Sequence, residues 1–428
     1  MSERNRRRGG RGRRGRRGHG QGDRGHGGHG GYGGPGHARG RRGGQGAHRA
    51  RRALIAIGLA VAGCGLVVST VALGLPDGLV SRSDPMAVPP PVVVSPPAHP
   101  STQVRHPEPD PRALLRATRT MAPRCTVSAK LVPSCGAWWG VAPASFTATP
   151  RTQALRDFER KIDRPVDIYH AYHRGHEVFP TNEEIAIARD PGQRRILLLN
   201  WKPDWGRSWA SVAAGSMDGH IDRLAAHIKA KFPEKFFMVI HHEPEEEVRP
   251  APGSGYTADD FRAMFRHVVH RFRAEGVRNA LFTVVFMGFD GWGRQPWFDR
   301  LYPGGDVVDW VGMDPYASAE MPDFARLVNQ TTDRGRGFPG FYNWSAKMAK
   351  GKPLMIAEWG VFSGHRHKAN FFKTVGAQFK RHPRIKAMVY FETPRGPFAG
   401  TQIDTRVDSS AASLAAFRKL SNEPQFMP

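Results

Sequence analysis

The sequence predicts a (β/α)8 barrel in its C-terminal two-thirds, preceded by an N-terminal region of different character. From Ala137 onward, eight short apolar runs alternate with stretches of helical period. Several runs end in carboxylate, histidine or aromatic side chains, where barrels of this class present functional groups. An open doubly wound sheet would place a glycine-rich phosphate loop after the first strand, but the chain reads Ala142-Pro143-Ala144-Ser145 there. We therefore expect an α/β fold, with the barrel domain over residues 121–428.

Residues 1–52 form a strongly basic, Gly-rich segment. They contain sixteen arginines and two acidic residues, and so carry +14 of the net charge of +25. With almost nothing apolar to bury, the segment is expected to be a disordered cytoplasmic tail. Binding of nucleic acid or anionic lipid is an alternative. A solvated basic tail is favoured, because Tyr32 is the one aromatic residue available for base stacking.

A membrane anchor is predicted over residues 53–75. These 23 residues carry no charge, and as a helix they would span about 35 Å, enough to cross a bilayer core of about 30 Å. The arginines upstream favour a cytoplasmic N-terminus and an extracellular barrel at the cell membrane, single-pass. A cleaved signal peptide is the alternative, which would give a secreted protein, but signal cores are shorter. Residues 76–120 are rich in proline and are expected to be an extended linker.

Two of the three cysteines follow the linker. Cys125 and Cys135 fall in the part expected outside the cell, where disulfides persist. A bridge between them would close a short loop and add roughly 2–3 kcal/mol of stability. Two free thiols are the alternative.

The eight predicted strands are short runs of mostly apolar residues. They are Ala137–Val141, Val166–Ala171, Arg195–Asn200, Phe236–His241, Ala280–Phe286, Val307–Met313, Pro353–Ala357 and Ile385–Phe391.

Helical patterns lie between these strands. The clearest begins at Thr257, a good N-cap residue followed three positions later by Asp260, and it ends at Gly276. It places six apolar side chains on one face. Other helices are expected from Met217, over His367–His382 and over Ser410–Leu420.

Two strand tips carry candidate catalytic carboxylates. The buried run Phe236–Ile240 is followed by His242 and Glu243, and Glu358 follows the apolar run of the seventh strand. A carboxylate at the end of an apolar strand is costly without partners, so two of them favour a functional pair. Aromatic and polar residues at the other tips and loops suit a carbohydrate-binding cleft. They are Trp139, His170, His173, Trp201, Trp205, Trp209, Trp292, Trp297, Asp314, Tyr316, Trp359 and Glu392.

The chain from about Ala137 to Leu420 resembles glycoside hydrolase family 26. The resemblance rests on the His242-Glu243 pair and on three runs, Tyr302–Tyr316, Lys352–Gly360 and Ile385–Phe391, and it extends to the turn Asp404–Ser410. The family belongs to a clan of retaining β/α-barrel enzymes. Its acid/base lies on the fourth strand and its nucleophile on the seventh.

The resemblance implies an enzyme that cleaves a β-linked polysaccharide of the β-mannan or mixed-linkage β-glucan type, without a cofactor. Glu243 would be the acid/base and Glu358 the nucleophile, with their carboxyl groups about 5–5.5 Å apart. Tyr316 would hydrogen-bond Glu358. The residues expected to contact substrate are His242, Tyr316, Asp314, Trp201, Trp139, His173, Trp205, Trp359 and Tyr390.

The chain departs from the family pattern after the acid/base. The family usually continues with Asn-Gly, whereas here Pro244–Glu247 follows. Tyr390 stands where a tryptophan sugar platform is usual, and Pro315 where glycine is common. Each of these departures concerns substrate contacts, so the polysaccharide is left open.

Two alternatives from other classes were weighed. A metal-dependent hydrolase is disfavoured, because H-E-x-x-H would need histidine at position 246, where glutamate stands, and Pro244 opposes the required helix. No metal is therefore expected. A membrane-anchored barrel that binds glycans without turnover is the other alternative, because a fold does not fix a function.

Overall fold

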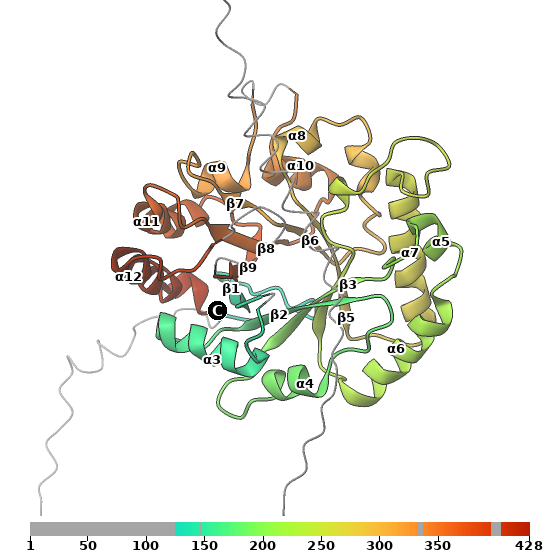
Figure 1. Cartoon of the computed structure of the whole chain (residues 1–428), viewed down its shortest axis with the longest axis horizontal. Coiled ribbons are helices and arrows are strands. Elements are labelled where there is room, and N and C mark those ends of the chain that lie inside the picture. Colours follow the sequence, from blue (N-terminus) through green and yellow to red (C-terminus); the bar gives the residue numbers. More distant parts are fainter. Residues whose placement is uncertain (1–124, 146, 333–336, 395–403) are drawn as a thin grey trace, which may run out of the picture. The chain divides into compact units, whose positions relative to one another are not determined.

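The computed structural model describes residues 125–428 except 146, 333–336 and 395–403 (Figure 1). The predicted tail, the predicted anchor over 53–75 and the whole of the predicted linker lie outside the described residues. Within the described part, no helix is both long and apolar enough to cross a membrane.

Eight parallel strands close into a barrel. Each strand pairs with its neighbour in the chain, and the pairings of the first strand with the last and of β6 with β8 complete the ring. A two-residue strand, β7 (Tyr316–Ala317), extends the line of β6 and pairs with β8. The predicted (β/α)8 architecture is thereby confirmed. The barrel strands are β1 (Trp138–Pro143), β2 (Ile168–Arg174), β3 (Ile196–Lys202), β4 (Phe236–Ile240), β5 (Ala280–Phe286), β6 (Trp310–Met313), β8 (Leu354–Val361) and β9 (Ile385–Glu392).

All eight predicted strands are found, with shifted ends. The largest shift is in the seventh predicted strand, where β8 runs on to Val361, four residues beyond the predicted end at Ala357. The sixth strand, β6, begins three residues late at Trp310, because Val307 and Val308 both donate backbone hydrogen bonds to Gly304 in a turn. The second strand runs on to Arg174, three residues beyond its predicted end.

Helices surround the barrel as an outer ring (Figure 1). The helix predicted from Thr257 is α7 (Ala258–Ala274), where the Thr257 side chain and Asp260 form a capping box. Gly276 follows it with φ +82°, a backbone conformation that glycine adopts without strain. The other α-helices are α3 (Arg151–Ile162), α4 (Asn182–Ala188), α5 (Trp209–Ala213), α6 (Asp218–Lys231), α8 (Asp290–Gly293), α9 (Phe324–Val328), α10 (Phe341–Met348), α11 (Lys368–Phe379) and α12 (Ala411–Ser421), and the 3-10 helices are η2 (Pro244–Glu246), η3 (Phe298–Leu301) and η5 (Pro424–Phe426).

The strands separate two hydrophobic cores because their side chains alternate between two faces. On β3, Leu197, Leu199 and Trp201 pack outward with the helices. Leu198 of the same strand belongs to a second core made of strand residues, which fills the barrel interior. The interior core comprises Ile168, Leu198, Phe237, Val239, Leu281, Val285, Trp310, Met355, Ala357, Ala387 and Val389.

A disulfide-closed loop covers the N-terminal end of the barrel. Cys125 and Cys135 are bonded, and Leu131 of this loop packs against the interior core. The indole nitrogens of Trp138 and Trp310 donate to backbone carbonyls of the loop, each at 2.7 Å. The loop therefore closes the barrel interior at the N-terminal ends of the strands. The C-terminal ends of the strands form the opposite, open end.

Candidate active site

Glu358 enters the barrel mouth because β8 carries a bulge. Ile356 pairs with Met388 and Trp359 with Tyr390, so two residues of β8 face one residue of β9. Ala357 belongs to the interior core and Trp359 to the outer core. The extra residue in a bulge redirects a side chain, and here it turns Glu358 toward groups on other strands.

Two tyrosines bind the Glu358 carboxylate. Tyr172 of β2 donates to Oε1 at 2.7 Å, and Tyr316 of β7 donates to Oε2 at 2.6 Å. Burial raises the pKa of Glu358, while the two hydrogen bonds act in the opposite direction. Both donors hold the carboxylate at a fixed orientation and favour its charged form.

Glu243 follows β4 on a constrained turn. His241 and Glu243 have φ values of +49° and +54°, a region that costs about 1–3 kcal/mol for a residue other than glycine. The backbone N–H of Glu243 donates to the Val285 carbonyl at 3.0 Å, which joins the turn to β5. The left-handed backbone conformation and the hydrogen bond to β5 therefore both fix the direction in which the Glu243 side chain points.

The two carboxyl groups differ in their electrostatics. Burial and then the charge of Glu358 raise the pKa of Glu243 well above its ordinary range, and Glu246 and Glu245 add to this. Within the described residues no hydrogen bond to the Glu243 carboxyl is found, whereas Glu358 accepts two. The surroundings thus favour the protonated form of Glu243 and the charged form of Glu358.

Asp314 is a third buried carboxyl at the mouth. It is fully buried at the end of β6. Burial, followed by the charges of Glu358 and Glu243, raises its pKa strongly. Neither of its carboxyl oxygens has a hydrogen-bond partner among the described residues. With no exposed surface in this structure, Asp314 interacts with the two glutamates through their charges.

The predicted residue His242 lies beside the pair. Its ring centroid is 5.8 Å from that of Tyr172. Burial and then the charge of Lys202 lower the pKa of His242 far below its ordinary value. A neutral imidazole at this point can donate or accept one hydrogen bond without adding charge.

Four predicted sugar contacts are instead core residues. Trp139, Trp201, Trp359 and Tyr390 have no exposed surface and belong to the outer core, between strands and helices. For Trp139, Trp201 and Tyr390 the reason is alternation, because each is one residue out of phase with the inward face of its strand. Trp359 would be in phase with the interior residue Ala357, and the bulge in β8 turns it outward instead. The expectation that they contact substrate is corrected by this placement.

The remaining two predicted residues lie at the end of β2 and in the loop after β3. His173 stacks on Phe179, and its two ring nitrogens lie 3.3 Å from Glu177 and 2.9 Å from Glu184. It therefore belongs to a structural ion-pair group. Trp205 is partly exposed, and the Arg174 guanidinium lies 4.3 Å from the centre of its ring.

Tyr172 and Phe391 are site residues that the sequence reading missed. Tyr172 bonds the proposed nucleophile, and Phe391 packs edge-on against both Tyr172 and Tyr316. Alternation was the available signal, since Tyr172 lies two residues after His170 and Phe391 lies directly after the outward Tyr390.

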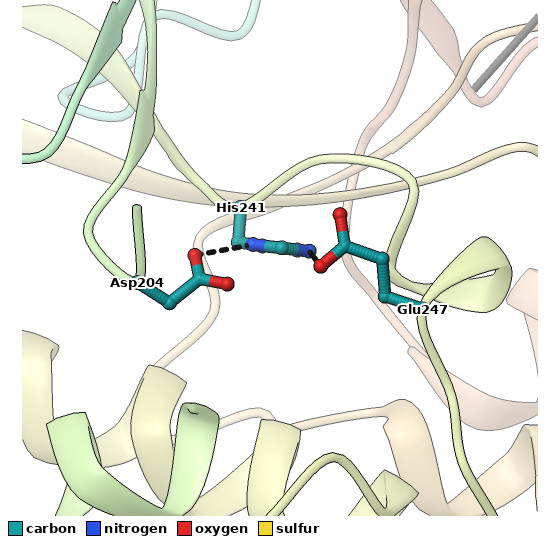
Figure 2. A group of neighbouring side chains, drawn as sticks. All are labelled: Asp204, His241 and Glu247. Atoms are coloured by element: carbon teal, nitrogen blue, oxygen red, sulfur yellow. Dashed lines mark hydrogen bonds and ion pairs between the residues drawn. The ribbon is translucent and has the colours of Figure 1, made fainter. Parts of the chain in front are cut away.

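A further polar group lies beneath the Glu243 turn, formed by Asp204, His241 and Glu247 (Figure 2). His241 Nδ1 is 2.7 Å from Asp204 Oδ1, and Nε2 is 3.8 Å from Glu247 Oε2. These residue types can bind a metal ion. However, the ring presents opposite edges to the two carboxylates, and the Lys202 ammonium pairs with Glu247. This arrangement fits a hydrogen-bonded ion network better than a shared ligand sphere.

The chain was compared with known proteins, and no family model matches it. It is 25% identical over 288 residues to Endoglucanase H of Acetivibrio thermocellus, covering 66% of this chain and 30% of that protein's length.

Solved structures with a similar arrangement include GH26 mannanases. A β-mannanase from Bacteroides ovatus superposes with a TM-score of 0.47 at 16% identity, over 68% of this chain and 90% of that one. A modular endo-β-1,4-mannanase from Cellulomonas fimi gives 0.46 at 17% identity, over 68% and 71%. The assignment of the fold rests on the strand pairing of the chain itself.

Proposed function

We propose that the protein is a retaining glycoside hydrolase that cleaves a β-linked polysaccharide. One observation supports this most strongly. Two carboxyl groups, one just after β4 and one near the C-terminal end of β8, lie in contrasting surroundings, with Glu358 buried and Glu243 half-buried. Glu358 accepts two phenol hydrogen bonds, while burial and the neighbouring charge favour the protonated form of Glu243.

The chemistry proceeds in two displacements. The Glu358 carboxylate attacks the anomeric carbon while Glu243 gives its proton to the departing glycosidic oxygen. Glu243, now ionised, removes a proton from water, which attacks the anomeric carbon and frees Glu358 from the sugar ester. We expect the carboxyl groups to lie about 5–5.5 Å apart, the separation that suits retention of configuration.

The substrate class is proposed from the residues around the two carboxyl groups and from the relatives. Asp314, His242 and Phe391 give the mouth polar groups beside an aromatic face, as a sugar ring requires. The relatives are named an endoglucanase and mannanases. We therefore propose mixed-linkage β-glucan and β-mannan as the first candidates.

Hydrolysis assays test this function. The full chain in detergent should release reducing ends from one of the two polysaccharides. Glu358→Gln should reduce kcat by several powers of ten, and Glu243→Gln by about 10²–10⁴-fold on the polysaccharide. The exposed Glu320→Gln is a matched control and should have wild-type activity. Binding of polysaccharide without product in the wild type would favour a glycan-binding protein.

A further inference from the structure

The ring of His241 lies between carboxylates from two other segments: Nδ1 is hydrogen-bonded to Asp204 at 2.7 Å, and Nε2 faces Glu247 at 3.8 Å, beyond hydrogen-bond distance. Asp204 lies in the loop after β3, and Glu247 closes the 3-10 turn after Glu243. The three side chains thus connect the loop after β3, the tip of β4 and the segment that follows Glu243 (Figure 2).

The same point is secured by other contacts. The backbone N–H of His241 donates to the Trp201 carbonyl at 2.8 Å, and Lys202 at the end of β3 pairs with Glu247. The ring of Trp209 packs edge-on at 5.1 Å from His241. His241 has no exposed surface, so its ring has no solvent to replace a lost partner.

The electrostatics of Asp204 agree with this geometry. Burial opposes ionisation of Asp204, but the attraction and hydrogen bond of His241 outweigh burial and hold the pKa of that carboxyl below its usual range. The carboxylate is therefore charged at neutral pH and forms a charge-assisted bond.

We propose that Asp204, His241 and Glu247 form a clamp that fixes the turn carrying Glu243, so that His241 is a positioning residue for the acid/base. The clamp acts through the backbone, because His241 and Glu243 are the two left-handed residues that bracket His242. Glu247 lies in the run Pro244–Glu247, where this chain departs from the family pattern. This inference rests on the proposed function for its catalytic part only.

The structural part is tested by amide hydrogen exchange on the full chain. Asp204→Asn and Glu247→Gln keep side-chain shape and should speed exchange in the segment 241–248. Glu247 is partly exposed, so its substitution disturbs the core least. The matched control is His267→Asn, which breaks a 2.6 Å His–Asp pair with Asp218 on the outer helices. It should leave this segment unchanged.

The catalytic part is tested with two aryl glycosides that share one sugar. Phenyl β-cellobioside needs a proton on its leaving group, whereas 2,4-dinitrophenyl β-cellobioside does not. A displaced Glu243 should lower kcat/KM for the phenyl substrate about tenfold more than for the dinitrophenyl one. A variant that is only destabilised would lose kcat/KM on both substrates by the same factor.

Three outcomes would overturn the clamp. The first is an unchanged exchange rate in the segment 241–248 of both variants. The second is an equal loss of kcat/KM on the two glycosides. The third is a loss of activity after EDTA treatment that added Zn²⁺ or Ca²⁺ restores. If the wild type hydrolyses no glycoside, the proposed function fails, and the exchange result alone decides the clamp: faster exchange supports it and unchanged exchange overturns it.

Discussion

At the scale of single residues, the two phenols on Glu358 set the state of the proposed nucleophile. A buried carboxylate is expensive, and hydrogen bonds to its charged form offset that cost. Tyr172 and Tyr316 come from different strands, so the nucleophile is oriented by the barrel and not by one loop.

Removal of either phenol should shift the pH profile. Tyr172→Phe takes one donor from the charged form of Glu358, so the pKa of that carboxyl rises further. The acid limb of kcat/KM should move to higher pH by about 1–2 units, since a hydrogen bond to a charged group contributes about 1.5–3 kcal/mol. Tyr342→Phe, on the distant α10, is the control and should leave the profile in place. An unshifted acid limb in Tyr172→Phe would contradict the role of this phenol.

Glu245 should make stability fall as pH rises. Burial raises its pKa from 4.5 to about 8, so the folded protein keeps this carboxyl neutral where the unfolded chain ionises it. The resulting loss of unfolding free energy is absent below about pH 4.5 and grows to about 3 kcal/mol at pH 7. Glu245→Gln should therefore stabilise the protein at pH 7 and not at pH 4, measured by urea unfolding. Equal effects at both pH values would contradict the burial argument.

At the scale of elements, the periodic patterns predicted most of the barrel. The apolar runs and the Thr257 capping box located strands and helices, because burial and capping are local signals. The face of the strand to which a side chain points is harder to predict from the sequence. Trp139 and Trp201 were assigned to the cleft from their place near strand ends, whereas alternation puts them on the outer face. The bulge at Glu358 depends on pairing with β9 and has no local signal.

Trp359 provides a test of this distinction. As a core residue in edge contact with Trp139 and Tyr390, its replacement by alanine should cost about 3–5 kcal/mol of unfolding free energy. KM of the remaining folded protein should stay near the wild-type value, measured below the melting temperature. A raised KM with unchanged stability would instead indicate a sugar platform.

At the scale of the whole molecule, the disulfide loop and the Glu243–Glu358 site lie at opposite ends of the barrel. The loop should therefore affect stability without affecting the chemistry. Cys125→Ser with Cys135→Ser should lower the unfolding free energy by roughly 2–3 kcal/mol. Both kcat and KM should remain unchanged at 25 °C. A change in kcat would show that the two ends are coupled.

Residues 53–75 are expected to attach the chain to the membrane. A chain lacking residues 1–75 should appear in the soluble fraction, while the full chain should stay with membranes after a high-salt wash. If the full chain is expressed and the medium contains a product whose N-terminus lies after position 75, the cleaved-signal alternative is supported.

The closed lower end of the barrel has a consequence for how this protein can change. Its interior is apolar and is sealed at the N-terminal ends of the strands by the loop 125–135, while the buried carboxyl groups of Asp314 and Glu358 lie at the mouth. The N-terminal end of the barrel thus contributes to stability, and the C-terminal end carries the proposed catalytic groups. New substrate preferences can arise by exchange of residues around the mouth, while the half that keeps the chain folded stays as it is.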